Sequence, residues 1–213
     1  MLSRQLLHPT VVRVFEMGLA QGFRYLTMEL LVGTKLADRM RSGPLGLDEG
    51  LGYLGQACAG LQAAHDLGIV HRDVKPNNFF ITEARVLKVM DFGLAKVRGA
   101  QGLTASGVIG GTPAYMAPEQ ASDFRAVTPA SDIYALGVVA YEMFTATLPF
   151  THENPLSILI MHRESPPPPP RSRNPSLPEE LEQIILHCLE KDPARRFGSC
   201  REMGRRVRAL RAR

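Results

Sequence analysis

Residues 71–80, HRDVKPNNFF, place two cations, one acid and two amides around a proline before the chain turns apolar. Transfer of a phosphoryl group needs such a set, because the acceptor hydroxyl must be aligned and the phosphate charge neutralised. Asp73 can accept or orient the hydroxyl proton, and Lys75 can neutralise charge on the phosphate. Asn78 and the later Asp91 can hold Mg²⁺ through oxygen atoms, the ligands that this cation prefers. The stretch therefore predicts a site for phosphoryl transfer.

The composition of the whole chain is that of a folded globular protein. Of its 213 residues, 45% are hydrophobic and 22% are charged, which is ordinary for a soluble domain with a real core. Much of the net charge of +4 lies in the terminal stretch REMGRRVRALRAR, residues 201–213. Such a tail can bind nucleic acid or an anionic membrane surface, but a terminal helix with a solvated basic face is the simpler interpretation. No basic and aromatic pattern supports a nucleic-acid partner.

The cysteines and the apolar stretches predict a cytoplasmic protein. Cys58, Cys188 and Cys200 are odd in number and form no Cys-x-x-Cys pair, so reduced thiols are expected in place of disulfides or a zinc site. The longest apolar stretch, residues 133–150, carries Glu142 and is predicted to be a core helix and not a membrane span. No signal-peptide pattern follows Met1.

The predicted elements run from a small β part to a helical body. Hydrophobic periodicity and turn residues predict strands at 11–15, 25–30 and 86–90, and helices at 48–67, 131–145, 181–192 and from 199 onward. The last helix opens with SCRE, which has the form of a capping box.

Two stretches are predicted to lack regular structure. Residues 94–130 are rich in Gly, Ala, Ser, Thr and Pro and are expected to form a long irregular segment. SPPPPPR, residues 165–171, is expected to be extended. A linker between helices is the simpler interpretation of the proline run, and a ligand for a proline-reading domain is the alternative.

Three motifs in register carry a family resemblance. HRDVKPNN, then DFG at 91–93 and APE at 117–119, resemble the catalytic loop, magnesium loop and activation-segment end of eukaryotic-type (Hanks-type) protein kinases. The lysine two residues after the acid, together with GTPAYMAPE at 111–119, resembles the serine/threonine pattern in its bacterial style. Small-molecule phosphotransferases with a similar core usually lack this lysine and this segment.

The resemblance implies an α+β, protein-kinase-like fold. It covers residues 1–213 as a partial kinase domain, with 1–30 a remnant of the β-rich N-lobe and the start of the hinge, and 31–213 the complete, mostly helical C-lobe. The family's Gly-rich loop, strand lysine and helix C glutamate have no counterpart in these residues, and their positions are expected to fall before Met1.

The resemblance also assigns roles residue by residue, with ATP and Mg²⁺ as cofactors. Asp73 corresponds to the catalytic base, Lys75 to the phosphate-neutralising residue, Asn78 and Asp91 to the magnesium ligands, and Thr112 to the residue that bridges Asp73 and Lys75. Around the nucleotide, Met28 corresponds to the gatekeeper, the backbone of Glu29 and Leu31 to the adenine contacts, and Phe80 to the pocket floor, where the family usually has a smaller aliphatic residue.

Further correspondences are structural or regulatory. His71 and Phe92 would stack in the hydrophobic spine, Asp132 would hydrogen-bond the catalytic-loop backbone, and Glu119 and Arg196 would form a buried ion pair. Arg72 would pair with a phosphate on the activation segment, for which Thr104 and Ser106 are the candidates. The alternative is that these two hydroxyls are ordinary polar loop residues.

The expected function is that of a serine/threonine protein kinase, which transfers the γ-phosphoryl group of ATP to a hydroxyl of a protein substrate. Residues 1–213 alone are expected to bind nucleotide weakly and turn over little, because they lack the N-terminal motifs. The alternative is a non-catalytic kinase-lobe interaction module, and the intact Asp73, Asn78 and Asp91 argue against it. No nucleic-acid partner and no membrane segment are expected in this chain, and no particular oligomeric state is implied.

Overall fold

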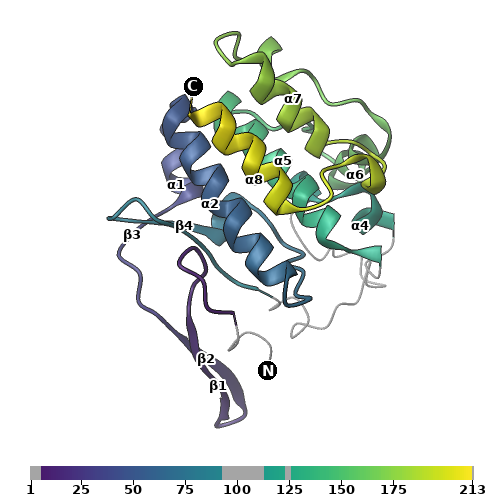
Figure 1. Ribbon diagram of the computed structural model, residues 1–213. Helices are drawn as coiled ribbons and strands as arrows, with labels where there is room; N and C mark the ends of the chain where they lie inside the picture. The colour runs from purple at the N-terminus through teal and green to yellow at the C-terminus, as the bar shows by residue number, and fades with distance from the viewer. Residues whose placement is uncertain (1–5, 93–112, 123–125, 213) are drawn as a thin grey trace.

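The computed structural model describes residues 6–92, 113–122 and 126–212. β1 (Val14–Ala20) and β2 (Phe23–Met28) form an antiparallel hairpin that projects from the helical body at the lower left of Figure 1. Gln21 and Gly22 make its two-residue turn with φ of +51° and +80°, the left-handed backbone that tight hairpins require. The hairpin confirms the two strands that the sequence predicts around a glycine turn.

The first strand begins later than predicted, because Val11 and Val12 pair with Val89 and not with the hairpin. Val11 forms an isolated parallel bridge with Val89, and the N–H of Val12 donates to the Val89 carbonyl at 2.9 Å. Both valine side chains are buried. The predicted strand at 11–15 is therefore split into a buried anchor on β5 and the start of the hairpin at Val14.

A second sheet lies between the hairpin and the helices, with the antiparallel order β3-β4-β5 (Figure 1). Its strands are short: β3 (Gly33–Lys35), β4 (Phe79–Thr82) and β5 (Leu87–Val89). β4 follows the HRDVKPNN stretch directly, after the 3-10 turn η2 (Pro76–Asn78). Phe79 and Ile81 of β4 are buried together with both ends of β5, so this small sheet fixes the catalytic-loop stretch to the core.

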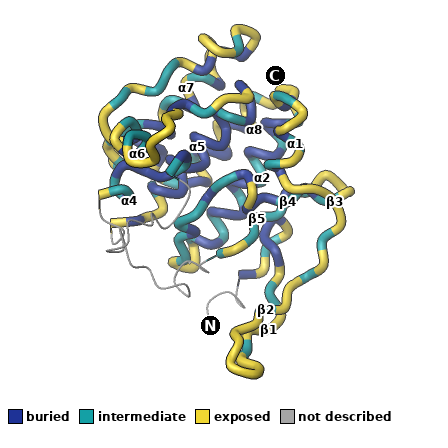
Figure 2. Tube along the Cα trace, turned by 180° about the vertical axis from the view of Figure 1, so that it is seen from behind, coloured by how far each residue is buried: buried dark blue, intermediate teal, exposed yellow. Residues whose placement is uncertain are grey.

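Helices make up the rest of the chain. They are α1 (Leu36–Met40), α2 (Leu47–His65), α4 (Pro118–Ser122), α5 (Pro129–Thr145), α6 (Pro155–Glu164), α7 (Glu179–Cys188) and α8 (Cys200–Arg211). In α5, 14 of the 17 residues are buried, so this helix is the centre of the body, as the dark blue tube in Figure 2 shows. The predicted helices at 48–67, 131–145 and 181–192 are confirmed by α2, α5 and α7.

The ends of α5 and α8 follow capping chemistry that the sequence carries. Thr128 and Ser131 form a capping box at the start of α5, where Pro129 takes the first helical position. At α8 the Ser199 hydroxyl accepts the N–H of Glu202 at 3.2 Å, while the Glu202 carboxylate accepts the N–H of Gly198 at 3.0 Å. The predicted cap of the last helix is thus confirmed, with the glutamate reaching one residue further back than a standard box.

The segment predicted to be irregular at 94–130 contains short helices in its described part. The 3-10 turn η3 spans Pro113–Tyr115, and α4 begins at Pro118. Both prolines occupy first-turn positions, where the missing N–H costs nothing and the fixed φ favours a helix. The composition of residues 94–130 predicted an irregular segment, whereas Pro113 and Pro118 each begin a short helical turn.

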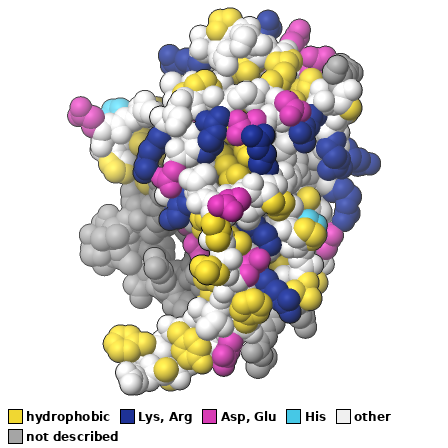
Figure 3. Space-filling model, turned by 90° about the vertical axis from the view of Figure 1, so that its left-hand side faces the viewer, with side chains coloured by type: hydrophobic (Ala, Val, Ile, Leu, Met, Phe, Trp, Pro, Cys, Tyr) yellow, Lys and Arg dark blue, Asp and Glu magenta, His cyan; other side chains and the backbone are white. Residues whose placement is uncertain are grey.

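The surface separates an apolar hairpin from a charged body. Met17, Leu19 and Phe23 of the hairpin are 48%, 69% and 77% exposed, and their end of the molecule forms the lower edge of Figure 3, below helices that carry mixed charges. In the described ranges no helix is long and apolar enough to cross a membrane. Cys58, Cys188 and Cys200 are all buried and free, in agreement with the expected reduced thiols.

Glycines in the two main helices make a matched test of helix packing. A Cβ added to Gly137 of α5 would overlap the Cβ of Cys188 on α7, whereas one added to Gly55 of α2 would meet only Val207 at 4.0 Å. We expect Gly137→Ala to lower the free energy of unfolding by about 1–2 kcal/mol through overpacking. Gly55→Ala is expected to raise it by about 0.5–1 kcal/mol through helix propensity. Urea unfolding of both variants measures this, and equal effects would contradict the packing argument.

Candidate active site

The catalytic-loop backbone is held by one buried carboxylate from α5. Asp132, which is 1% exposed, accepts the backbone N–H of His71 at 2.8 Å and that of Arg72 at 2.9 Å. His65 Nε2 lies 2.8 Å from the same carboxylate. Arg72 has a φ of +71°, a left-handed conformation that is unfavourable for arginine. Asp132 therefore stabilises a strained turn immediately before Asp73.

His71 links this turn to the end of β5. Its Nε2 lies 2.7 Å from the carbonyl oxygen of Met90, which can only accept, so Nε2 carries the proton. Nδ1 is then free to accept the N–H of Asp73, at 3.3 Å. The imidazole also packs on Phe92, with ring centroids 4.7 Å apart. The loop and the DFG stretch are thus joined by both hydrogen bonds and ring packing.

Asp73, Lys75 and Asn78 form one polar cluster. Lys75 Nζ lies 2.8 Å from Asp73 Oδ2, and Asn78 Nδ2 donates to the same oxygen at 3.1 Å and to the Asp73 carbonyl at 2.7 Å. Because both partners use Oδ2, the other carboxylate oxygen makes no hydrogen bond within the described residues. Asn78 likewise donates with its nitrogen, and its Oδ1 makes no hydrogen bond within the part of the chain that the structure describes. The cluster can therefore present one carboxylate oxygen and one amide oxygen to a ligand.

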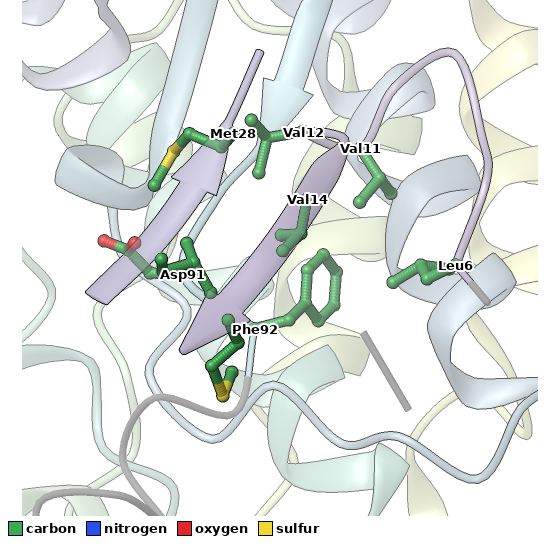
Figure 4. A pocket seen from close by; sticks show the side chains of 9 residues that line it. Leu6, Val11, Val12, Val14, Met28, Asp91 and Phe92 are labelled. Carbon is green, nitrogen blue, oxygen red and sulfur yellow. The ribbon is translucent and has the colours of Figure 1, made fainter. Parts of the chain in front are cut away.

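Asp91 is exposed, and among the described residues it forms no hydrogen bond or ion pair with this cluster. It has a φ of +62°, and its carboxylate points to the opposite side from the Phe92 ring (Figure 4). The Met90 N–H donates to the Asn78 carbonyl at 2.9 Å, which brings the end of β5 beside η2. No group of three His, Cys, Asp or Glu side chains that could hold a metal occurs in the part of the chain that the structure describes. Asn78 Oδ1 and the Asp91 carboxylate still match Mg²⁺, which takes few protein oxygens and keeps the rest of its shell for water and phosphate.

A pocket opens between the hairpin and the DFG stretch. Its lining is apolar apart from Asp91, and Figure 4 shows the Phe92 ring turned toward Leu6 and Val11. The lining residues are Leu6, Val11, Val12, Val14, Met17, Leu26, Met28, Asp91 and Phe92. Of the residues predicted to surround the nucleotide, only Met28 and Asp91 line this pocket.

Glu29 follows β2 and is fixed by two partners. Its carboxylate accepts the backbone N–H of Arg13 at 2.8 Å and binds Lys88 Nζ at 2.7 Å. Burial favours the neutral acid, but the hydrogen bonds from Lys88 and Arg13 outweigh it and hold the pKa of Glu29 below its ordinary value. The Glu29 N–H donates to the Arg13 carbonyl, so its own carbonyl is the backbone group left for a ligand. Phe80 is half-buried on β4, opposite Lys35 and Lys88 in the sheet register.

The protein kinase domain family matches residues 1–206 of the chain. The chain belongs to this family. The serine/threonine-protein kinase Pkn1 of Myxococcus xanthus is 43% identical over 197 residues, which cover 90% of the chain and 28% of that relative. The serine/threonine-protein kinase PknA of Mycobacterium tuberculosis (strain ATCC 25618 / H37Rv) is 40% identical over 211 residues, which cover 96% of the chain and 48% of that relative. The chain thus spans about a quarter to a half of the length of these curated relatives, and the predicted kinase-like α+β fold is confirmed.

The end of the GTPAYMAPE stretch is anchored by a buried ion pair. Arg196 NH1 and NH2 each lie 2.8 Å from one oxygen of Glu119. Burial would raise the pKa of Glu119, but the hydrogen bonds of Arg196 and Ser131 lower it below its ordinary value. Gln120 Nε2 also donates to the Arg72 carbonyl at 2.8 Å. The ion pair thus fixes the end of the stretch to the helical body, and Gln120 joins it to the catalytic loop.

The sequence did not point to a second anchor, between Tyr115 and Glu142. The Tyr115 hydroxyl donates to Glu142 Oε2 at 2.6 Å. Burial raises the pKa of Glu142, and it also raises that of Tyr115, where the neighbouring carboxylate adds to the effect. A glutamate within the longest apolar stretch was the available signal, because a charge in a core helix needs a partner. Thr104, Ser106 and Thr112 lie outside the described residues.

Proposed function

We propose that the chain is the catalytic-loop part of a serine/threonine protein kinase, which transfers the γ-phosphoryl group of ATP to a serine or threonine hydroxyl of a protein. The observation that carries this is the cluster in which Lys75 and Asn78 both bind Oδ2 of Asp73. Membership of the protein kinase family and the relatives named serine/threonine-protein kinases support it.

Asp73 would act on the acceptor hydroxyl with its free oxygen. Lys75 and Asn78 hold Oδ2, so Oδ1 would accept the hydroxyl proton or orient the hydroxyl for attack. Lys75 has three donors and uses one on Asp73. The others would neutralise charge on the phosphoryl group as it moves. The carboxylate is held by Lys75 and Asn78, which supports transfer because positioning and charge neutralisation are most of this chemistry.

Asn78 Oδ1 and the Asp91 carboxylate would hold Mg²⁺. The ion would neutralise charge on the ATP phosphates. Asp91 is exposed beside the loop, and Asn78 is buried at its base. Adenine would lie near the carbonyl of Glu29 and the backbone of Leu31, with Met28 and Phe80 against its ring.

We also propose that residues 1–213 on their own bind ATP weakly. They contain no Gly-rich phosphate loop and no strand lysine of the family type, and each such contact typically contributes 10²–10³-fold to the rate. We expect Mg²⁺·ATP at a few millimolar to stabilise the chain by less than about 1 kcal/mol, the effect of a ligand near its dissociation constant. Thermal unfolding with and without Mg²⁺ measures this. Asp91→Asn should remove the Mg²⁺-dependent part, and a large shift that survives Asp91→Asn would contradict both proposals.

A second candidate function is a non-catalytic docking module. It is favoured by the exposed apolar hairpin, on which Leu19 and Phe23 are 69% and 77% exposed, since such patches often mark interaction sites. A fusion separates the two candidates. The region of Pkn1 that precedes its match to this chain is joined to residue 1, and phosphate transfer to serine- and threonine-containing peptides is measured. Transfer supports the enzyme, whereas a folded fusion without transfer supports the module.

A further inference from the structure

The proline run between α6 and α7 is a sequence feature that the proposed function does not use. Residues 165–169 each precede a proline, and a residue in that position is driven to an extended conformation. Ser165 has φ of −87° and ψ of 135°, and Pro169 has φ of −56° and ψ of 128°. Both pairs of angles are those of polyproline II, so the extended conformation that the sequence predicts is confirmed at both ends of the run.

Exposure along the run follows the threefold period of polyproline II. Because this helix has three residues per turn and a rise of about 3.1 Å per residue, Pro166 and Pro169 share one edge, about 9 Å apart. Both are exposed, whereas Pro167 and Pro168 are half-buried. Pro170, one turn after Pro167, is buried. The run thus turns one edge toward the helical body and presents another edge, with Pro166 and Pro169, to solvent.

The backbone of the run offers acceptors and no competing donors. A proline has no N–H, and among the described residues the carbonyls of residues 165–168 accept no hydrogen bond. The Pro169 carbonyl, by contrast, accepts both the N–H and the hydroxyl of Ser172, at 2.9 and 2.6 Å. The run is therefore fixed at its C-terminal end, and the carbonyls before that end can accept from a partner.

Arg171 places a positive charge directly after the run. Its backbone N–H donates to Glu182 Oε2 at 2.7 Å, which fixes the residue to α7. Its side chain is exposed, and the guanidinium makes no hydrogen bond or ion pair within the ranges that the structure describes. In Figures 1 and 2 the segment between α6 and α7 runs along the outer edge of the helical body, away from the hairpin. A partner can therefore approach the run and Arg171 together.

We propose that residues 165–171 are a docking segment for a protein domain that has an aromatic-lined groove with a carboxylate at one end. Aromatic rings in such a groove pack on the exposed prolines of a polyproline II segment, and tyrosine or tryptophan side chains donate to its carbonyls. The carboxylate pairs with Arg171. The segment is already extended in the fold, so little conformational entropy is lost on binding. This role goes beyond the kinase function, does not depend on it, and is compatible with a linker that is anchored at Pro170.

Titration with purified SH3 and WW domains tests the proposal, because both kinds of domain read polyproline II through aromatic grooves. The folded chain of residues 1–213 and the free peptide 163–173 are titrated against the same panel of domains by calorimetry. We expect at least one domain to bind both, with dissociation constants within about tenfold of each other, since the fold presents the segment already extended. A panel that binds neither of them, or binds only the peptide, overturns the proposal.

Alanine variants of the prolines give a matched comparison. Pro166→Ala and Pro169→Ala remove the exposed edge, and we expect each to weaken binding of the domain to the folded chain by about tenfold or more. Pro167→Ala, on the half-buried edge, is the control and should change the affinity by less than about threefold. Equal weakening by all three variants overturns the proposal. Where a variant does not fold, competition decides: displacement of the wild-type chain by peptide 163–173 supports one shared groove, and no displacement overturns it.

Arg171→Ala tests the charged end of the segment. We expect about tenfold weaker binding at low salt and a smaller loss at high salt, because salt screens an exposed ion pair. Arg163→Ala is the control, since it removes an exposed arginine that already pairs with Glu164 at 2.6 Å. It should change the affinity by less than about threefold. Equal losses in the two variants would indicate general charge attraction and overturn the proposed pairing with Arg171.

Discussion

Asp73→Asn is expected to lower kcat of the Pkn1 fusion about 10³-fold, with little change in KM for ATP. The amide keeps the shape of the carboxylate but cannot accept the hydroxyl proton, and general-base catalysis contributes about 10²–10⁴-fold. Lys75 also loses its charged partner at 2.8 Å. The measurement is phosphate incorporation into a peptide at saturating ATP and Mg²⁺.

The control for this variant is Asp38→Asn on α1. Asp38 is also an ion-paired carboxylate, with Arg41 at 2.7 Å, but its side chain is 44% exposed and it lies outside the cluster. It should leave kcat unchanged, and both variants should unfold within about 1 kcal/mol of wild type, because exposed ion pairs contribute little. Asp73→Asn activity within tenfold of wild type would show that Asp73 is not the base.

The sequence predicted the catalytic-loop cluster because its members are close along the chain. Asp73, Lys75 and Asn78 lie within six positions, and the proline between them begins the turn η2. Local chemistry therefore determines most of their geometry. The long helices were predicted for a related reason, since α2 and α5 carry many apolar residues at helical spacing.

The unpredicted features join residues that are far apart in sequence. His162 meets Ala114 across 48 positions, and Tyr115 meets Glu142 across 27. No local pattern names the partner in such a pair, even where a residue such as Glu142 in an apolar helix indicates that a partner is needed. α6 itself was missed, because Pro155 and the proline run after it hide a helix of ten residues. That Asn78 and Asp91 hold Mg²⁺ stays a prediction, since no hydrogen bond joins these two side chains among the described residues.

The ion pair between Glu119 and Arg196 is the contact whose loss should most reduce stability. The Arg196 side chain is 0% exposed and that of Glu119 is 13% exposed. The guanidinium donates to both carboxylate oxygens of Glu119. It also donates to the backbone carbonyls of Ala130, Glu190 and Lys191, at 2.9, 2.8 and 3.1 Å. Removing Arg196 would leave a buried carboxylate and these carbonyls without their donor.

Arg196→Ala is therefore expected to lower the free energy of unfolding by about 3–5 kcal/mol, the usual result of breaking a buried pair from one side. Arg195→Ala is the matched control. The Arg195 side chain is 69% exposed, and its NH2 atom lies 3.4 Å from Glu190 Oε1, which is a long ion pair. We therefore expect the free energy of unfolding to change by less than about 1 kcal/mol. Guanidinium unfolding of both variants measures the difference.

Acid should reduce the gap between wild type and Arg196→Ala. The pKa of Glu119 is lowered in the folded protein, so the pair contributes fully above the ordinary value of 4.5 and is lost as the pH falls through the lower folded value. In Arg196→Ala the largest remaining influence is burial, which raises the pKa of Glu119, while the Ser131 hydroxyl and a backbone hydrogen bond lower it less than Arg196 does. The difference in unfolding free energy should therefore shrink below pH 4.5. A gap that stays constant down to pH 3 would mean that Arg196 stabilises the fold through its backbone carbonyls and the Tyr134 ring, and not through Glu119.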